Sequence, residues 1–443
     1  MSKKILVLGA GKSSSALIQF LAETASVNGW SVMVADQSEQ AAKHAIINKP
    51  NLSGCAIDIT KEDQLNKLIS GSNVVLSLLP AHLHPLVAKK CVENNAHLIT
   101  ASYVSDEMRA LHQRAEQSGL LLLNECGLDP GIDHISAMEI IDRIRESGGE
   151  IHTFRSFTEG LIAPATDPEN PWRYKFTWNP RNVVTAGQGF ATYREDSKLK
   201  RIPYQQLFKR TFAIEVPGTG KFDGYANRDS LKYCDAYGLQ QVKTMIRGTL
   251  RYHGYCQAWD ILVQLGCCED QGLISTEGLS HLDFLNLFLP ASANSVEKKI
   301  SLLFRLTEDS KEIQMLRWSG FFSDESIGIT SGTPAQILEH ILNKKWKMNA
   351  TDLDQIVMWH QFIYIQNGQQ HEIQSTLVDE GKPDGPTAMA RTVGLPMGIA
   401  AKLLLENKIN LRGVQIPVSK QLYVPLLKEL SNHAIVMKEY QIS

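Results

Sequence analysis

The first fifteen residues contain a glycine pattern that could bind the phosphates of a nucleotide. Residues 9–14 read GAGKSS, which matches GxGxxG except that serine replaces the third glycine. The first glycine permits a tight turn, the second lets a phosphate approach the backbone, and the NH groups of a following helix attract a pyrophosphate. We therefore expect a dinucleotide to contact Gly9, Ala10, Gly11, Lys12 and Ser13.

An acidic residue stands where such a site contacts the adenosine ribose. The apolar segment WSVMVAD ends on Asp36, and a carboxylate there accepts bonds from the ribose and repels a 2′-phosphate. The next residue, which is also expected to contact the cofactor, is Gln37 rather than arginine. The pattern therefore favours NAD over NADP, although Lys43, further along the next helix, could still reach a phosphate.

Two later strand ends are expected to lie along the same cofactor, because ligands of parallel sheets gather at the carboxyl ends of the strands. Asp58 and Ile59 follow the third predicted strand and would border the adenine. Leu78 and Leu79 follow the fourth and would lie toward the nicotinamide.

The segment LLLLNECGLDPGIDH, residues 120–134, combines acids, a cysteine and a histidine that could suggest a metal site. Asp133 and His134 are neighbours at the start of a predicted helix, where adjacent side chains point in different directions. We therefore expect no metal. The rigid proline and permissive glycine of Asp129-Pro130-Gly131 instead predict a turn from the cofactor sheet into a second domain.

The elements that position these residues form a regular series. Short apolar strands alternate with helical segments through residue 125, which predicts an N-terminal Rossmann domain, a doubly wound parallel sheet. Residues 126–389 predict a second, α+β substrate domain with a mixed sheet and a helical insert at about 255–346. Residues 390–443, which begin with a long apolar helix, are expected to pack back on the first domain.

Composition narrows the class of protein. The chain has 45 Lys plus Arg and 47 Asp plus Glu, a formal charge of -2, so no global field would attract nucleic acid or anionic lipid. Seven cysteines without a CxxC pair fit reduced thiols, and we expect a cytoplasmic protein. No apolar stretch approaches a membrane span of roughly 20 residues, so we expect no association with membranes.

Several longer motifs together resemble the saccharopine dehydrogenase family in its glutamate-forming branch. They are SLLPAHLHPLV, ITASYVSDEM, NECGLDPGIDHISAM, NPWRYKFTWNPRNV, YANRDSLKY, IRGTLRYHGY and ARTVGLPMGIAAKLLL. The resemblance implies an enzyme that uses a nicotinamide cofactor to interconvert saccharopine with glutamate and 2-aminoadipate 6-semialdehyde in lysine metabolism. It also implies a small amino-acid substrate and a homo-oligomer, a dimer.

Matching positions carry the family's site residues onto this chain. The resemblance implies that Trp178 contacts the cofactor, and that saccharopine contacts Ser102, Tyr103, Asp129, Arg228, Thr249, Leu250 and Arg251. Arginines suit this role because a guanidinium binds a carboxylate in a fixed orientation.

Proton transfer is expected to involve Asp129 and Tyr103. His84 is a weaker candidate, because a histidine in the first turn of a helix is often only solvated. The chain departs from fungal members of the family at Thr158, where they commonly carry cysteine, and at Glu159, where they carry glycine. Glu159 could take part, but we expect a solvent-facing loop residue.

Two rival functions remain. A related imine oxidoreductase, such as carboxynorspermidine dehydrogenase or a homospermidine-type synthase, would act on a polyamine and favour acids over arginines in its site. A regulator that binds NAD without turnover would need the glycine turn but not Asp129, Arg228 and Arg251.

Overall fold

The computed structural model describes residues 2–442, which form two compact units. Unit 1 contains the chain up to Glu150 together with Asp379–Lys438. Unit 2 contains Ile151–Val378 and the residues from Glu439 onward.

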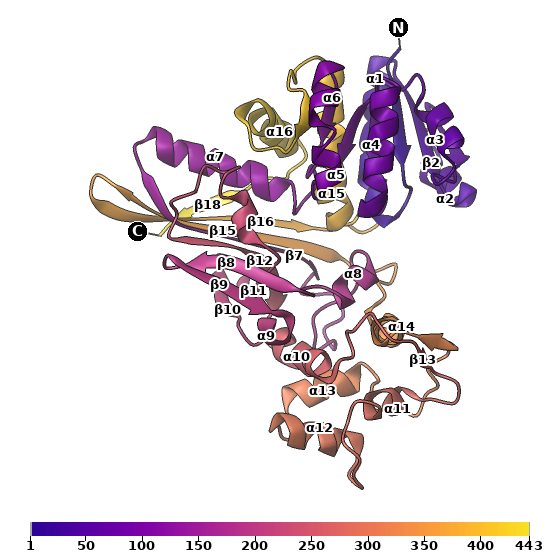
Figure 1. The fold of residues 1–443 in the computed structure, drawn as a ribbon, viewed down its shortest axis with the longest axis vertical. Helices are drawn as coiled ribbons and strands as arrows, with labels where there is room; N and C mark the ends of the chain where they lie inside the picture. Colours follow the sequence, from indigo (N-terminus) through magenta and orange to yellow (C-terminus); the bar gives the residue numbers. More distant parts are fainter. Residues whose placement is uncertain (1, 443) are drawn as a thin grey trace. The chain divides into compact units, whose positions relative to one another are not determined.

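Unit 1 is built on a seven-stranded sheet in the order β17-β6-β5-β4-β1-β2-β3 (Figure 1). Every neighbouring pair is parallel. The strand order reverses between β1 and β4, and such a switch point is where doubly wound folds bind ligands. The strands are β1 Lys4–Leu8, β2 Ser31–Asp36, β3 Leu52–Ala56, β4 Val74–Ser77, β5 His97–Thr100, β6 Leu121–Leu123 and β17 Gly413–Gln415.

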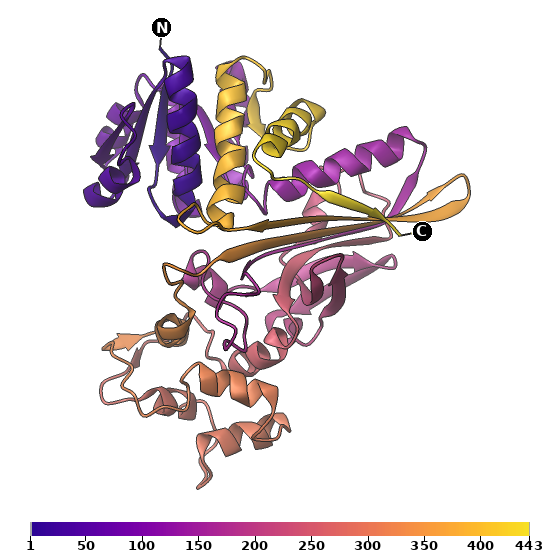
Figure 2. The same cartoon turned by 180° about the vertical axis from the view of Figure 1, so that it is seen from behind.

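Helices cover the two faces of this sheet. Leu6 and Leu8 of β1 point to the face where α3 and α4 supply Leu65 and Val87 to one hydrophobic core. On the other face α1 and α15 run side by side (Figure 2). The helices are η1 Lys12–Ser14, α1 Ser15–Asn28, α2 Glu39–Ala45, α3 Glu62–Ile69, η2 Ala81–Leu83, α4 His84–Glu93, α5 Asp106–Arg109, α6 His112–Gln117, α7 Ile132–Glu146, α15 Ala388–Leu405 and α16 Lys420–Asn432.

By length and composition alone, α15 could cross a membrane, contrary to our reading of the sequence. In the structure 83% of its apolar window is buried within the protein. Its apolar character is therefore explained by packing against α1 and the sheet.

Unit 1 extends further than the predicted boundaries at 125 and 390. It continues through α7 to Glu150 and resumes at Asp379. The physical reason is that α7 packs on α16, where the Tyr423 hydroxyl donates to Asp142 Oδ2 at 2.7 Å. The turn Asp129-Pro130-Gly131 therefore lies inside unit 1 rather than at the passage into the second unit.

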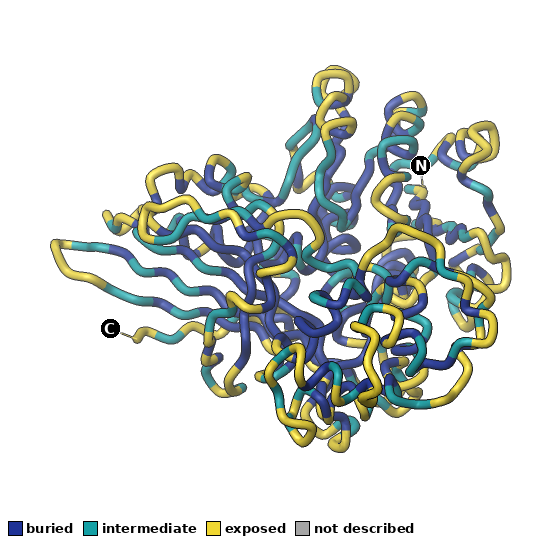
Figure 3. Tube along the Cα trace, turned by 60° about the horizontal axis from the view of Figure 1, so that its bottom comes forward, coloured by how far each residue is buried: buried dark blue, intermediate teal, exposed yellow. Residues whose placement is uncertain are grey.

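Unit 2 is built on a nine-stranded mixed sheet with the main order β10-β11-β12-β7-β15-β16-β18. The central strand β12 is parallel to β7 and antiparallel to β11. Figure 3 shows that buried residues concentrate along the strands and exposed residues in the connecting loops. The strands are β7 Glu150–Ile162, β8 Phe190–Glu195, β9 Lys198–Pro203, β10 Phe212–Val216, β11 Gly220–Ala226, β12 Thr244–Tyr252, β15 Asp354–Gln366, β16 Gln369–Glu380 and β18 Lys438–Gln441.

Helices between β12 and β15 form the insert that the sequence predicted. It begins with α10 at Tyr255 and ends with α14 at Trp346, and Trp172, Trp259 and Trp346 pack ring against ring in its core. The remaining elements of unit 2 are α8 Pro180–Val184, α9 Tyr204–Leu207, η3 Ser230–Tyr233, α10 Tyr255–Leu265, β13 Ile274–Ser275, α11 His281–Asn286, α12 Val296–Phe304, α13 Lys311–Trp318, β14 Ser331–Gly332 and α14 Pro334–Trp346.

Two glycines of α15 allow its close approach to α1. A Cβ atom at Gly394 would lie 2.8 Å from the Leu17 nitrogen, and one at Gly398 would lie 2.6 Å from Phe20 Cδ1. We predict that Gly394→Ala lowers the free energy of unfolding by about 1–3 kcal/mol, because overpacking outweighs the better helix propensity of alanine. Urea unfolding would measure it, with Gln19→Ala on the exposed face of α1 as control. A Gly394→Ala chain as stable as the control would contradict this close contact.

Candidate functional site

The glycine turn connects β1 to α1 through the short helix η1, which the sequence did not predict. Gly9 has φ +104°, and its NH donates to the Ala35 oxygen at 2.8 Å. A Cβ at Gly9 would lie 3.3 Å from the Leu78 oxygen, whereas one at Gly11 would meet nothing within 4 Å. The turn thus leaves open space over Gly11 and the first NH groups of a helix, which fits a nucleotide phosphate.

Asp36, the last residue of β2, bonds to the backbone through both carboxylate oxygens. Oδ2 accepts from the Ala10 NH at 2.8 Å, and Oδ1 accepts from the Ser38 NH at 2.9 Å. Asp36 therefore holds the glycine turn in place as well as the start of α2. Gln37, beside it, is exposed.

The structure places the other predicted cofactor residues of unit 1 at strand ends. Asp58 lies beyond the end of β3 and accepts from the Thr60 hydroxyl at 2.6 Å. Ile59 contributes to the hydrophobic core, so its side chain is committed to packing. Leu78 and Leu79 follow β4, and the Leu78 NH donates to the Leu8 oxygen at 2.9 Å, which ties this end to β1.

Ser102, Tyr103 and Asp129 come together within unit 1. Ser102 and Tyr103 follow β5, and Asp129 follows β6, the next strand in the sheet. The Tyr103 hydroxyl donates to Asp129 Oδ1 at 3.2 Å. The two residues expected to move protons are therefore hydrogen-bonded to each other.

His84 was expected to be solvated, and this is wrong, because the side chain is buried. Its Nδ1 lies 3.0 Å from Ser77 Oγ, and its Nε2 lies 2.9 Å from Ser102 Oγ and 3.1 Å from Thr100 Oγ1. Ser77 ends β4 and Thr100 ends β5, so the imidazole joins two strand ends and orients Ser102. Burial, together with the charge of His82, lowers the pKa of His84 to about 4.

A buried acid and histidine support the segment that carries Tyr103. Glu125 accepts from the Val104 NH at 3.0 Å through Oε1, and its own NH donates to the Ser102 oxygen at 3.1 Å. Its Oε2 lies 2.8 Å from His134 Nε2. The segment 102–104 is therefore bonded to Glu125 at both ends.

Asp133, the other acid of this region, accepts from the Gly131 NH at 2.6 Å and so closes the turn after Asp129. Within residues 2–442, no group of three or more His, Cys, Asp or Glu side chains has an arrangement that could hold a metal ion.

In unit 2, one face of β12 carries two of the predicted substrate residues. Thr249 and Arg251 alternate onto the same face of the strand, and Arg251 is only 2% exposed. Leu250 points to the opposite face, so only its backbone could contact a ligand beside Thr249. Arg228 lies in the exposed turn after β11 with φ +51°.

Glu159 was expected to face solvent from a loop, and this is wrong. It belongs to β7, is buried, and forms an ion pair with Arg251 through its Oε2 and Nη1 of the guanidinium. Its Oε1 accepts from the Gly160 NH at 3.0 Å. Burial raises the pKa of the Glu159 carboxyl, and the charge of Arg251 opposes that rise. Nothing in the sequence indicated that Glu159 pairs with Arg251, because the two residues lie on different strands that are far apart in the chain.

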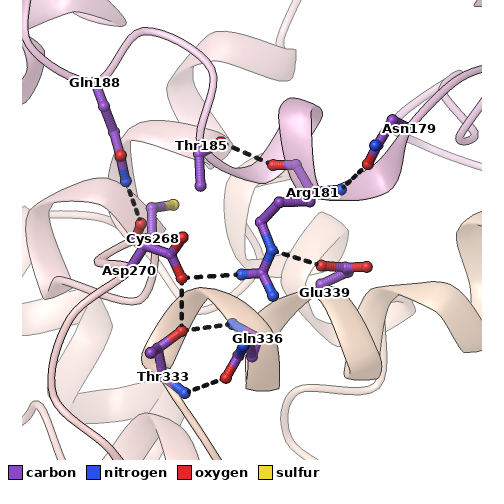
Figure 4. Close-up of polar contacts among 9 residues, drawn as sticks. All are labelled: Asn179, Arg181, Thr185, Gln188, Cys268, Asp270, Thr333, Gln336 and Glu339. Atoms are coloured by element: carbon purple, nitrogen blue, oxygen red, sulfur yellow. Dashed lines mark hydrogen bonds and ion pairs between the residues drawn. The ribbon is translucent and has the colours of Figure 1, made fainter. Parts of the chain in front are cut away.

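Trp178 is held beside an anchored helix. Asn179 caps α8, and Arg181 of this helix reaches Asp270 at 3.2 Å and Glu339 of α14 at 3.1 Å (Figure 4). The Thr333 hydroxyl also donates to Asp270, which joins the start of α14 to the same cluster. The segment that carries Trp178 is thereby fixed to the helical insert.

The buried His84 predicts a dependence of stability on pH. Its folded pKa of about 4 lies below the ordinary value of 6.5, so between these values the unfolded chain binds more protons. We predict that the free energy of unfolding falls as the pH drops from 6.5 to 4, with a contribution of about 3 kcal/mol from His84.

Urea unfolding at several pH values would measure this slope. His84→Gln should flatten it, because the variant has no proton to gain there, whereas His44→Gln at an exposed position should leave it unchanged. Equal slopes for His84→Gln and the unmodified chain would refute the buried, neutral imidazole.

Family models match almost the whole chain. The saccharopine dehydrogenase NADP binding domain matches residues 5–123, and the saccharopine dehydrogenase C-terminal domain matches residues 127–436. The resemblance seen in the sequence motifs is confirmed.

Curated relatives fall into two length classes. The chain is 32% identical to saccharopine dehydrogenase [NADP(+), L-glutamate-forming] of Saccharomyces cerevisiae, over 100% of both chains. It is 33% identical to the mitochondrial alpha-aminoadipic semialdehyde synthase of Rattus norvegicus, over 98% of this chain. The chain spans about half, 47%, of the length of that longer relative.

The preference for NAD over NADP is wrong. The matching N-terminal family model is an NADP binding domain, and the yeast relative is named for NADP(+). The preference assumed that Asp36 presents its carboxylate to a ribose and repels a 2′-phosphate. In the structure both oxygens of Asp36 accept backbone NH groups, so the carboxylate also holds the glycine turn and the start of α2, a role that the cofactor argument did not consider.

The solved structure of apo saccharopine dehydrogenase (L-Glu forming) from Saccharomyces cerevisiae has the same fold. It matches with a TM-score of 0.90 at 30% identity, over 100% of both chains. The predicted fold class, a doubly wound parallel sheet with a second mixed-sheet domain, is thus confirmed. Sequence motifs, family models and fold agree, and the chain belongs to the saccharopine dehydrogenase family.

Proposed function

We propose that this chain is an NADP-dependent oxidoreductase that interconverts saccharopine with L-glutamate and 2-aminoadipate 6-semialdehyde in lysine metabolism. The observation that carries the proposal is the end-to-end match to a relative of the same length that is named for this reaction. The bound cofactor would accept or supply the hydride. The glycine turn of residues 9–14 and Trp178 would hold that cofactor.

The substrate chemistry fits the cationic and hydroxyl groups of the chain. Saccharopine carries carboxylates that a guanidinium can clamp, and Arg228 and Arg251 would serve as such clamps. Thr249 would add a hydroxyl on the same face of β12 as Arg251. Ser102, oriented by the neutral His84, is a further proposed substrate contact.

Proton movement would use the hydrogen bond from Tyr103 to Asp129. Hydride transfer requires an unprotonated secondary amine, and hydrolysis of the resulting imine requires a base for water. Asp129 can accept a proton from the amine or from water, and the Tyr103 hydroxyl at 3.2 Å can pass one on. Thr158 cannot replace the cysteine thiol of fungal relatives as an acid, because a hydroxyl is a far weaker one.

The rival functions are less well supported. A polyamine substrate would repel the arginines that the motifs supply. A regulator without turnover would not need the pair Tyr103 and Asp129. The predicted homodimer stays a prediction.

Steady-state oxidation of saccharopine by the purified chain tests the proposal. We expect absorbance of the reduced cofactor to rise with NADP, and glutamate to form in equal amount. Absence of turnover with NADP, in a chain that binds NADP by calorimetry, would eliminate the proposed reaction.

The bonds of Asp36 predict an effect on cofactor binding. In Asp36→Asn a single amide oxygen replaces two acceptors, so either Ala10 or Ser38 loses its partner. We expect binding of NADP to weaken by about 1 kcal/mol, roughly fivefold, because the glycine turn is less well held. Calorimetric titration would measure this, with the exposed Asp63→Asn as control. Tighter binding of NADP by Asp36→Asn would instead show that the carboxylate repels the 2′-phosphate.

A further inference from the structure

The ion pair of Glu159 and Arg251 lies among buried polar atoms whose hydrogen-bonding capacity is unused. Within the described residues, Arg251 Nε and Thr158 Oγ1 are buried and have no hydrogen-bond partner, and the buried Tyr174 Oη and Trp178 Nε1 have none besides each other. Each of these atoms carries a hydrogen that it can donate. An unpartnered buried donor costs about 1–3 kcal/mol, so such a group of donors is best explained by a ligand that accepts from them.

These atoms belong to one neighbourhood. The Arg251 guanidinium carbon lies 4.8 Å from the Tyr174 ring centre and 4.9 Å from that of Tyr255. Burial raises the pKa of Tyr174 and the charge of Glu159 adds to the rise, whereas the charge of Arg251 and a hydrogen bond with Trp178 oppose it. Thr158 stands directly across from Thr249 in the register of β7 and β12.

Glu159 uses only one end of the guanidinium. It contacts Nη1, which also donates to the Leu250 oxygen at 3.2 Å, and this leaves the Nε side without a protein partner. A carboxylate from a ligand can therefore bind on the Nε side while Glu159 keeps its place on Nη1. Such binding would leave two carboxylates around one guanidinium, an excess negative charge in a buried site.

A positive group on the ligand would remove that excess. A primary ammonium on the same carbon as the carboxylate, as in an α-amino acid, brings one charge of each sign within reach of the pair. We propose that Glu159 and Arg251 together select a ligand end group that is an α-amino acid, with Arg251 binding its carboxylate and Glu159 its ammonium.

The proposal rests on the proposed function, since saccharopine has such an end group on its lysine side. It adds Glu159 as a specificity-determining residue.

A structural role for Glu159 would be a different explanation, in which it only neutralises Arg251. A neutralising role requires nothing of the ligand's ammonium. The two explanations therefore differ in whether the chain distinguishes ligands with and without that group.

The experiment compares two compounds by calorimetry on the full chain loaded with NADP. One is saccharopine, and the other is N-(5-carboxypentyl)-L-glutamate, which keeps every carboxylate and lacks only the primary ammonium. We expect the unmodified chain to bind saccharopine tighter by on the order of tenfold to a hundredfold, as for a charged hydrogen bond in a buried site. Equal affinities, or no binding of either compound, would overturn the proposal.

Glu159→Gln keeps the shape and removes the charge, so it should reduce this preference to within about twofold. Glu215→Gln, on the exposed side of β10, is the matched control and should keep the full preference. If Glu159→Gln still preferred saccharopine over the analogue to the full extent, another acid would have to bind the ammonium. If that variant does not fold, Glu159→Asp tests the same point: it keeps the charge but shortens the reach to the ammonium, so it should lower the preference, and an unchanged preference would overturn the role of Glu159.

Binding and turnover separate the two proposals. A chain that prefers saccharopine over the analogue but does not oxidise it has the end-group site without the proposed reaction. A chain that oxidises both compounds with equal KM has the reaction without the selection by Glu159.

Discussion

Parallel pairing of β1 with both β2 and β4 is the constraint on which unit 1 depends. Because parallel strands present their carboxyl ends at one edge, this pairing brings together segments that are far apart in the chain. The Gly9 turn and Asp36 meet there through the bond from the Ala10 NH. The next strands bring Ser77 and Ser102 to the two sides of His84. The edge thus determines where the glycine turn and these hydroxyl groups lie.

At this edge, buried backbone groups and buried side chains form hydrogen bonds with each other. Glu125 both donates and accepts across the segment 102–104, and His134 occupies its second oxygen. Such a network fixes geometry because each lost bond would leave a buried group unpaired. Tyr103 can therefore hold its bond to Asp129 without being in a regular element.

The sequence predicted what depends on local pattern. The glycine turn, the strand and helix alternation and the limits of the insert from Tyr255 to Trp346 all follow from spacing within a few residues. The boundary of unit 1 was missed because it depends on the packing of α7 on α16, whose residues lie far apart in sequence. The cofactor preference failed for a related reason. The sequence cannot distinguish an acid at the end of β2 that binds a ribose from one that accepts from the Ala10 NH.

Glu159 shows most clearly why a site cannot be read from residue types alone. Glu159 was expected to face solvent from a loop, yet it lies in β7 and is buried, and its partner is 92 positions away on β12. Burying two charges costs about as much as their attraction returns, so well-packed apolar residues would stabilise the sheet equally well. Stability therefore does not account for the pair. The unused donors of Tyr174, Thr158 and Arg251 add a further cost in the free chain, and a ligand that accepts from them would recover it. The burial that makes the charge of Glu159 unfavourable for folding is thus the reason to expect that this charge acts on a ligand.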